Sequence, residues 1–475
     1  MKKTLLNILY NAIYQIFLVL IPLITVPYLS RTLGPGSYGI YSNVNNVIQF
    51  LMVFCSLSIS YIGMRTISKI RAHSNKEELT EAFWGLWYFQ ALASSVMIIL
   101  FIIFLLFIHI KYWNYFFIML PFLVSAQLDI SWFFQGLAEF GKVVLRNTCV
   151  KLLSIALILL LVKNPQDLDK YMLIMSVSTL LGSCVFWLNI KQYVAKPVKH
   201  FYKFQQTIKA IIILLIPQIA TQIYTALDKP LLGMFQSSTQ VSFYDNSQKI
   251  SKIILGIITS ITIVMMPKMA AEIKEKQRVM LRKSLEATVM LGLIFAVVVM
   301  INTKEFVPFF FGDKYLAMTD LMFWFTLTVV IIPLGGVFAN QFALANGKDK
   351  EYAIPVIIGA IIECIAASIL DIAYGACGAL IAILFTETIV CVLRIWIVRK
   401  DYEFKYVFQD IPKYFLAAII TFACGMLMPS LTHSAFINMA YKSILVMLIY
   451  GVILALLHLE LNQDIVTVIK KIIKR

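Results

Sequence analysis

Charged residues are scarce in this sequence. Only 14% of its 475 residues are Asp, Glu, Lys or Arg, whereas 60% are hydrophobic. Such a balance leaves too little polar surface to cover a soluble protein. The sequence therefore predicts an all-α integral membrane protein, in which helices satisfy their own backbone hydrogen bonds.

Long polar loops and clustered metal ligands are missing as well. No loop between apolar runs exceeds roughly 18 residues, whereas a soluble catalytic or binding domain needs at least about 50. The seven cysteines include no CxxC pair, and the five histidines form no HxxxH pair. We expect no catalytic residue, no metal site and no cofactor, and we expect the function to lie within the membrane.

Apolar runs of about 20 residues, the length that crosses a hydrocarbon core of about 30 Å, fill most of the chain. We count about fourteen such segments. They lie at 8–30, 39–63, 82–108, 115–136, 143–163, 170–190, 208–228, 241–266, 285–303, 317–344, 352–371, 376–398, 412–430 and 439–459.

The formal net charge of +16 is distributed unevenly between the two sides of the membrane. About 27 of the 41 Lys and Arg residues fall in the termini and the alternate loops on their side, and about 8 fall at the opposite loops. This positive-inside pattern predicts that both termini are cytoplasmic. A nucleic-acid partner is not expected, because the basic residues do not gather on one soluble face.

Three short matches link the two halves of the chain in the same order. They pair Ile21-Pro22-Leu23-Ile24 with Ile216-Pro217-Gln218-Ile219, Tyr41-Ser42-Asn43 with Tyr244-Asp245-Asn246, and Gln135 plus Gly141-Lys142 with Gln341 plus Gly347-Lys348. The matches predict two parallel six-helix bundles, 1–206 and 207–405. Residues 406–475 would add two transmembrane helices and a basic cytoplasmic tail.

Transporters commonly use such repeats because two similar bundles can rock around a shared site. Helix breakers occur where rocking would need them, at Pro22, Pro217 and Pro333. The alternative is that these prolines are ordinary residues of membrane helices.

Several ionisable residues are predicted to lie at membrane depth, where they are costly unless they line a watery path or meet a partner. Asp245, Lys249 and Lys252 share one helical face, and Lys252 lies about 16 Å from the outer end of its helix. We expect Lys252 to face a hydrated cavity; a structural ion pair is the alternative. Lys151 lies about 12 Å into its helix, where snorkelling to the cytoplasm explains it equally well.

Three further charged residues have two interpretations each. Glu363 and Glu387 lie near the membrane midplane, where they would carry protons or sodium ions or would only hydrogen-bond across a helix interface. Arg31 lies at a helix end, where anchoring at the interface is the default and contact with an anionic substrate is the alternative.

The segment DISWFFQGLAEF, residues 129–140, places Asp129 about 21 Å from the outer end of its helix, in the inner third of the membrane. Because Gln135 recurs as Gln341 in the other half, we expect this segment to form one half of a cytoplasmic gate. Asp129, Gln135, Gln341 and Asp245 are therefore assigned gate or structural roles.

Three signatures carry a resemblance to a known family: LGPGSYGIYS at 33–42, DISWFFQGLAEF at 129–140 and AYGACGALIAILFTE at 373–387. With them, the chain resembles the lipid-linked oligosaccharide flippases of the polysaccharide-transporter family, which share a fold with the multidrug and toxic-compound exporters. One departure is Ser368 with Ile372-Ala373, where members often have an asparagine and a helix-breaking proline. The local helix ending is therefore expected to differ.

The resemblance implies a transporter rather than an enzyme, located in the cytoplasmic (inner) membrane. Its substrate would be an undecaprenyl-pyrophosphate-linked oligosaccharide for O-antigen, capsule or exopolysaccharide synthesis, moved by alternating access. Membrane lipids, a polysaccharide polymerase and a chain-length regulator would be its partners, and transport would be coupled to H⁺ or Na⁺ at Glu363 or Glu387. The phosphates would need cations in a hydrated cavity, for which the candidates are Lys252, Lys249, Lys151 and Arg31.

Two rival functions remain. A multidrug exporter of the same fold would favour carboxylates and aromatic residues for cationic drugs, whereas this chain offers intramembrane lysines. A membrane enzyme such as a polysaccharide polymerase or an acyltransferase would need a large outer loop or a buried catalytic histidine, and the sequence has neither.

Overall fold

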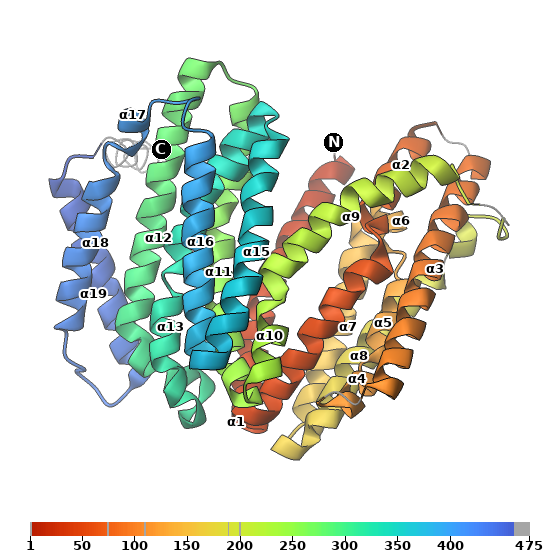
Figure 1. Ribbon diagram of the computed structural model, residues 1–475, viewed down its shortest axis with the longest axis horizontal. Helices are drawn as coiled ribbons and strands as arrows, with labels where there is room; N and C mark the ends of the chain where they lie inside the picture. The colour runs from red at the N-terminus through yellow and green to blue at the C-terminus, as the bar shows by residue number, and fades with distance from the viewer. Residues whose placement is uncertain (1, 74–75, 109–110, 189, 199–200, 460–475) are drawn as a thin grey trace. The chain divides into compact units, whose positions relative to one another are not determined.

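The computed structural model describes residues 2–73, 76–108, 111–188, 190–198 and 201–459. The helices form two compact units, Met1–Ser242 and Phe243–Arg475; the first runs from red to yellow-green in Figure 1 and the second from green to blue. The predicted basic tail, 460–475, lies outside the described residues. The boundaries at 206 and 405 describe the sequence repeat and stay predictions.

The first unit contains a long first helix, against which helices from later in the chain pack. Its helices are α1 (Lys2–Ser56), α2 (Ile59–His73), α3 (Lys76–Phe107), α4 (Trp113–Ile118), α5 (Leu120–Leu128), α6 (Ser131–Gly136), α7 (Phe140–Leu161), α8 (Leu168–Trp187), α9 (Phe204–Ala226) and α10 (Asp228–Phe235). α1 contacts α3, α5, α7, α9 and α10.

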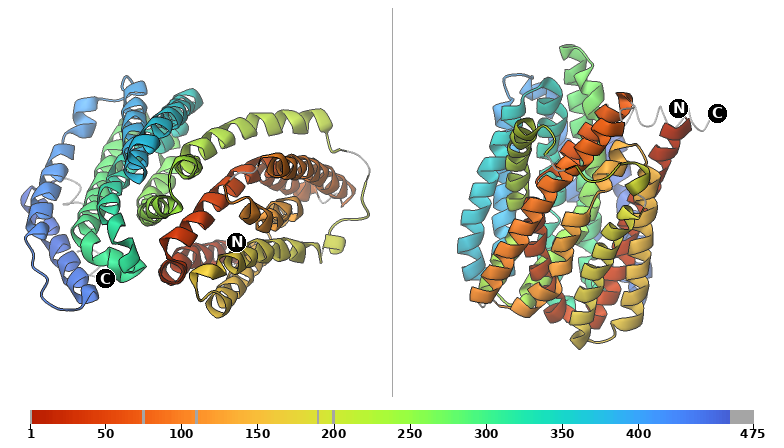
Figure 2. Two further views of the ribbon diagram at one scale, coloured as in Figure 1. Left: turned by 60° about the horizontal axis from the view of Figure 1, so that its bottom comes forward. Right: turned by 90° about the vertical axis from the view of Figure 1, so that its right-hand side faces the viewer.

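The second unit is built around α12 and ends in two appended helices. Its elements are α11 (Ser238–Ala270), which begins in the first unit, α12 (Lys274–Phe311), α13 (Thr319–Phe325), α14 (Thr328–Gly336), the π-helix η4 (Val337–Ala343), α15 (Asp349–Tyr374), α16 (Ala376–Ile397), α17 (Phe404–Phe408), α18 (Ile411–Met426) and α19 (Ala435–Leu456). Figure 2 shows α18 and α19, in blue, alongside the green α12, which both of them contact.

Twelve helices of the described residues are long and apolar enough to cross a membrane. Each of the fourteen predicted segments lies mostly in helix. Two circumstances explain why the number of candidate spans is lower than fourteen. The first two segments join in one candidate span, Leu20–Arg71, and the seventh lies in α9, of which Phe204–Leu215 counts as a shorter apolar helix. The prediction of an all-helical membrane protein is confirmed.

The LGPG sequence, residues 33–36, forms the bend within α1 that joins the first predicted segment to the second. Gly34 adopts φ 70° and ψ 172°, a left-handed backbone that glycine tolerates, and Pro35 then begins the second half of α1. Gly39 lies so close to the start of α11 that a Cβ atom there would be 1.7 Å from the carbonyl oxygen of Ser238. Both glycines are therefore needed for this bend and its packing.

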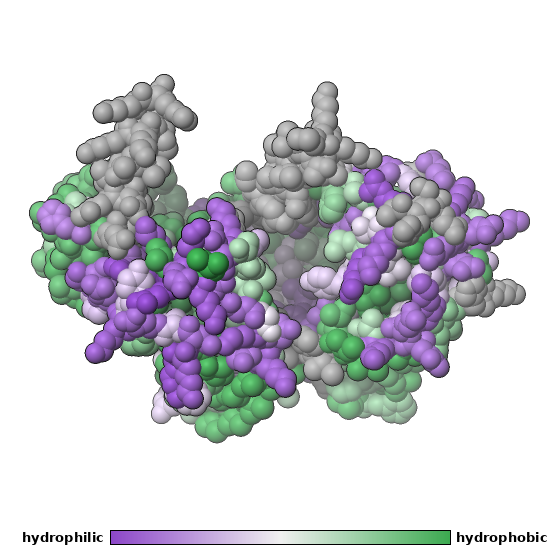
Figure 3. Space-filling model, turned by 90° about the horizontal axis from the view of Figure 1, so that it is seen from above, coloured by the Kyte–Doolittle hydropathy of each residue, from purple (hydrophilic) through white to green (hydrophobic). Residues whose placement is uncertain are grey.

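The outer helices present apolar side chains on one face and bury small or polar ones on the other. On α15, Ile361 and Ile365 are more than half exposed, whereas Glu363 and Ala367 are buried. Helical periodicity places these two pairs on opposite faces. Figure 3 shows polar residues gathered on the end of each unit that faces the viewer and apolar residues around its sides, which fits side faces in contact with lipid.

Candidate functional site

The predicted intramembrane carboxylate Asp129 lies at a break between two helices. α5 ends at Leu128, and Asp129 takes an extended backbone with φ −75° and ψ 103° before α6 begins at Ser131. The Asp129 carboxylate accepts a hydrogen bond of 2.9 Å from the backbone N–H of Ser131. Its observed interaction is therefore a local turn in which the carboxylate satisfies a backbone donor at the start of α6, whose N-cap residue is Ile130. The gate role stays a prediction.

Side chains from α3 and α8 satisfy the carbonyl groups that this break leaves without helical partners. Four consecutive carbonyls accept side-chain N–H groups, as the absence of water in a membrane requires. The bonds are Gln90 Nε2 to Ala126 O (2.5 Å) and to Asp129 O (2.9 Å), Trp87 Nε1 to Gln127 O (3.1 Å), and Trp187 Nε1 to Leu128 O (2.8 Å).

The Gln90 side chain also joins the break to the aromatic residues of DISWFFQG. Its oxygen accepts a 3.0 Å hydrogen bond from the indole N–H of Trp132. Trp132 in turn packs against α2, where a Cβ atom at Gly63 would lie 2.3 Å from its ring. Gln90 therefore uses both its N–H groups and its oxygen to hold α6 in place.

A polar cavity of about 420 Å³ lies inside the first unit, between α1, α5, α7 and α8. Its size is within the range of ordinary ligand sites. Two stripes of polar side chains line it, one on α1 and one on α7. They are Tyr41, Asn45 and Gln49 on α1 and Arg146, Asn147 and Lys151 on α7.

The two cations of this cavity differ in their partners. Arg146 is tied to α8 by hydrogen bonds to the Gly182 carbonyl (2.6 Å) and the Ser183 hydroxyl (3.1 Å). Lys151 forms no hydrogen bond or ion pair with the described residues. An ammonium group inside a membrane bundle is costly unless water or an anion meets it, so Lys151 is suited to an anionic ligand.

The other predicted cations belong to the second unit, except for Arg31 of α1. Lys249 forms an ion pair of 2.5 Å with the buried Asp245 on α11, as their spacing predicted. Lys252 is exposed one turn further along the same helix. Arg31 is exposed on α1 and does not line the cavity around Lys151. The substrate-binding roles of these three residues stay predictions.

Glu363 and Glu387 are both buried in the second unit, with exposed fractions of 2% and 4%. Glu363 lies on α15 and Glu387 on α16, two helices that pack closely after a turn at Gly375. Their burial fits either alternative, an ion-carrying role or a hydrogen bond across a helix interface, and ion coupling there stays a prediction.

The corresponding loops of the two halves are fastened in similar ways. In the first clasp, as we call it, Lys142 forms an ion pair of 2.8 Å with Glu139 and hydrogen-bonds to Tyr193, which follows α8. In the second clasp, Lys348 forms an ion pair of 2.5 Å with Asp401, which follows α16. The matched lysines, one in the first turn of α7 and one at the N-cap of α15, thus tie the start of the fifth predicted helix of each half to the segment that follows the sixth.

Aromatic residues accompany each clasp. Phe134 packs against Tyr193 with ring centroids 5.7 Å apart, and Phe338 packs against Tyr402 at 5.3 Å. Burial and the neighbouring Asp401 carboxylate raise the pKa of Tyr402, so its phenol stays neutral at physiological pH. The predicted gate residues lie nearby in sequence, Gln135 in α6 and Gln341 in η4.

Sequence reasoning missed a buried ionic network that attaches the appended helices to α12. Arg282 pairs with Glu286 at 2.8 Å and with Asp410, at the start of α18, at 2.6 Å. Further along α12, Glu305 pairs with Lys442 of α19 at 2.7 Å. The spacing of Arg282 and Glu286 indicated one pair, but nothing local indicated the partners more than 120 residues away.

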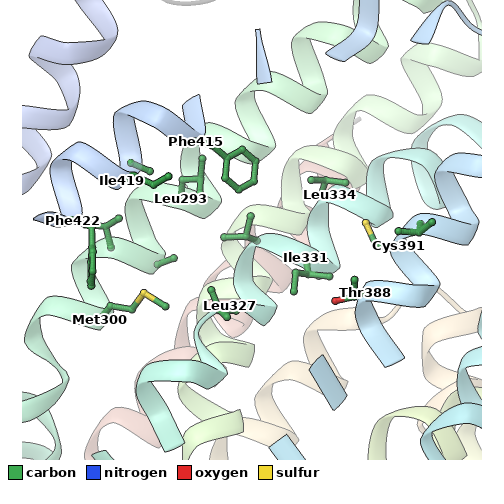
Figure 4. A pocket seen from close by; sticks show the side chains of 15 residues that line it. Leu293, Met300, Leu327, Ile331, Leu334, Thr388, Cys391, Phe415, Ile419 and Phe422 are labelled. Carbon is green, nitrogen blue, oxygen red and sulfur yellow. The ribbon is translucent and has the colours of Figure 1, made fainter. Parts of the chain in front are cut away.

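A second cavity, of about 370 Å³, lies in the second unit between α12, α14, α16 and α18 (Figure 4). The labelled side chains that point into it are almost all apolar, including Leu293, Ile331 and Phe415, and Thr388 is the exception. The pocket has no charged lining residue and so offers no cation to a phosphate.

Comparisons with known proteins agree with this architecture. A family model described as "Polysaccharide biosynthesis protein" matches residues 4–272, more than half of the chain. The chain belongs to this family. The resemblance to polysaccharide transporters is thereby confirmed.

Relatives and solved structures add detail about what the chain is similar to. It is 22% identical over 407 residues to a protein of Escherichia coli (strain K12) named "Putative O-antigen transporter", a match that covers 83% of this chain and 96% of that protein. A protein of the same name from Shigella dysenteriae is 21% identical over 393 residues, with 80% and 96% covered. The prediction of a transporter rather than an enzyme agrees with these names.

The fold recurs in two kinds of solved transporter. The lipid II flippase MurJ, in an inward closed conformation, matches with a TM-score of 0.76 at 14% identity, over 97% of this chain and 100% of that one. An inward-facing multidrug transporter of the MATE family matches with a TM-score of 0.60 at 15% identity, over 83% and 98%. At these identities the likeness concerns the fold alone.

Proposed function

We propose that the protein is a flippase that moves undecaprenyl-pyrophosphate-linked oligosaccharide units from the cytoplasmic to the outer leaflet by alternating access. The units would serve O-antigen, capsule or exopolysaccharide synthesis. Family membership and relatives named as O-antigen transporters support this class of substrate. The observation that carries the proposal is the ammonium group of Lys151, which lies in a polar cavity of a membrane bundle without a partner among the described residues.

The chemistry of such a substrate matches the cavity. A pyrophosphate cannot cross hydrocarbon unaided, and cationic side chains that donate hydrogen bonds are its natural ligands. Lys151 supplies an available charge and Arg146 a positioned one, while Lys249, Lys252 and Arg31 are further candidates. The lipid tail would remain in the bilayer, and the polymerase and chain-length regulator would receive the product on the outer side.

Further parts of the proposal concern topology and energy. Both termini would be cytoplasmic, in the inner membrane, as the positive-inside pattern predicts. The buried carboxylates Glu363 and Glu387 would couple transport to H⁺ or Na⁺. The multidrug exporter of the same fold is the alternative, supported by the MATE likeness and weakened by lysines where a cationic drug would need carboxylates.

The test is lipid exchange in liposomes that contain the purified protein and a fluorescent undecaprenyl-pyrophosphate oligosaccharide. Lys151→Ala is expected to lower the exchange rate about tenfold or more, since a charged hydrogen bond contributes about 1.5 to 3 kcal/mol. Lys252→Ala is tested beside it. Lys170→Ala, which removes an exposed lysine paired with Asp167 on the surface, is the control and should exchange lipid normally.

One result would count against the flippase assignment, and another would count against the role of Lys151 alone. Export of a cationic dye without exchange of any lipid-linked sugar would favour the multidrug exporter. Normal exchange by Lys151→Ala would remove Lys151 from the binding site and leave the flippase assignment in place.

A further inference from the structure

The polar cavity of the first unit has two chemically different walls. The α7 wall carries the cations Arg146 and Lys151, whereas the α1 wall carries the amides Asn45 and Gln49. Asn45 and Gln49 are four residues apart and so share one helical face, together with Tyr41 one turn earlier. Both charged side chains of the cavity therefore lie on the α7 wall, and the α1 wall offers only neutral hydrogen-bonding groups.

The two amides of the α1 wall stand out by their lack of protein partners. Neither Asn45 nor Gln49 forms a hydrogen bond with the described residues. The polar groups of the α7 wall behave differently, since Asn147 accepts a hydrogen bond of 2.6 Å from Arg146 and Ser154 donates one of 2.7 Å to the Val150 carbonyl. Unsatisfied amides inside a membrane bundle are costly, so water or a ligand must meet them.

The chemistry of an amide distinguishes between possible ligand groups. Each amide offers two N–H donors and one carbonyl acceptor. A phosphate accepts hydrogen bonds and has nothing to give to the carbonyl, whereas a sugar hydroxyl donates and accepts at once. Tyr41 and Tyr171, whose rings meet edge to face with centroids 4.6 Å apart, line the same cavity and give it the aromatic surface common in ligand pockets.

We infer that Asn45 and Gln49 bind the first sugar of the lipid-linked oligosaccharide, beside the pyrophosphate at Lys151. This inference rests on the proposed function and adds a sugar-selective subsite to it. The cavity would then recognise both parts of the headgroup, with the charged part on α7 and the neutral part on α1. Asn45 and Gln49 would thereby determine which sugar the protein accepts.

The experiment compares two fluorescent lipids in liposomes that contain the full-length protein. One is undecaprenyl pyrophosphate without a sugar. The other carries a single glucose, galactose or N-acetylglucosamine, chosen as the one that the unsubstituted protein exchanges fastest. The variants are Asn45→Ala, Gln49→Ala and Lys151→Ala, with Gln205→Ala, which removes an exposed amide at the start of α9, as the control.

The expected result is a difference between the two lipids. Asn45→Ala and Gln49→Ala should slow exchange of the sugar-bearing lipid about three- to tenfold each, the effect of one neutral hydrogen bond, and should leave the sugar-free lipid unchanged. Lys151→Ala should slow both lipids. Unchanged exchange of the sugar-free lipid also serves as the check that each amide variant is folded.

Two other results would overturn the inference. Equal slowing of both lipids by the amide variants would mean that Asn45 and Gln49 only support the bundle or hold water. The absence of any preference for a sugar-bearing lipid would mean that no sugar subsite exists. Both results leave the flippase standing, whereas a lack of exchange with every lipid-linked sugar would reject the proposed function itself.

Discussion

The fourth predicted helix of each half meets the same problem and solves it differently. In the first unit the chain breaks at Asp129, and N–H groups of Gln90, Trp87 and Trp187 satisfy the freed carbonyls. In the second unit the corresponding segment stays helical and widens into the π-helix Val337–Ala343. Both halves therefore have an irregular backbone at the matching place in the fourth predicted helix, but different interactions stabilise it in each half.

The difference has a local cause in each half. A break within a membrane helix exposes backbone groups that must find donors, and the first unit supplies two tryptophans and a glutamine from α3 and α8. The second unit places Pro333 shortly before η4, and a π-helix absorbs the irregularity within the helix itself. The first arrangement is therefore fixed by side-chain hydrogen bonds to freed carbonyls. The second keeps its irregularity inside a helix whose residues Val337, Phe338 and Phe342 are buried in the core of the second unit.

The largest expected loss of stability comes from removing the hydrogen bonds at the Asp129 break, and a matching substitution in the π-helix is tested beside it. Gln90→Leu leaves two carbonyls and the Trp132 N–H without their partner, and it should lower the free energy of unfolding by about 3 to 6 kcal/mol. Gln341→Leu removes one hydrogen bond, from the Ser284 hydroxyl (2.6 Å), together with a buried amide nitrogen that has no partner among the described residues. It should cost about 1 kcal/mol or less.

Thermal unfolding of both variants in detergent micelles measures this difference. Gln205→Leu is the control for adding an apolar side chain at an exposed site. Equal loss in the two variants would mean that the hydrogen bonds at the break are not what holds α6, and the contrast between the halves would disappear.

The sequence predicted the fold far better than it predicted these contacts. Hydrophobic length located all twelve candidate membrane spans of the described residues, because a membrane imposes a span of about 20 residues on each helix. Asp129 was recognisable as unusual, since a carboxylate interrupts an apolar run. Its surroundings were not predictable, because Trp87 and Gln90 come from a helix about 40 residues earlier and no local pattern links them to the break.

The candidate site was likewise predictable in part. Lys151 was identified by its depth, and the structure places it in a cavity. Asn45 and Gln49 were missed, although their spacing of four residues was visible, because neutral amides at that spacing occur equally at helix interfaces. Only the tertiary packing of α1 against α7 shows that the two stripes line one space.

A second comparison sets the buried ion pairs around Arg282 in the second unit against the exposed ion pairs of the clasps. Breaking the buried pairs should have the next largest effect on stability. Arg282 is buried between Glu286 and Asp410, and Arg282→Met leaves buried carboxylates without their guanidinium. The expected loss is about 3 to 5 kcal/mol, because a buried charge keeps its desolvation penalty when its partner is removed. Thermal unfolding measures the loss, and limited proteolysis between α16 and α18 should become faster.

The triple variant Arg282→Met, Glu286→Leu, Asp410→Leu gives the matched control. Replacing these three buried charges with apolar residues should recover most of the lost stability, because the remaining partner of Asp410, Lys413, is 48% exposed and can be solvated. If the triple variant is no more stable than Arg282→Met, the network contributes through geometry that apolar packing does not replace.

The smallest effects are expected at the clasps, where the two halves are most alike. The side chains of Lys142 and Lys348 are 48% and 30% exposed, and exposed ion pairs contribute about 1 kcal/mol or less. Lys142→Met and Lys348→Met should therefore lower the unfolding temperature only slightly and by similar amounts.

If the clasps keep each bundle rigid while the bundles rock, the double variant Lys142→Met, Lys348→Met should slow lipid exchange more than either single variant does. If only one of the two single variants lowers the unfolding temperature, the two clasps are alike in geometry but not in their contribution to stability.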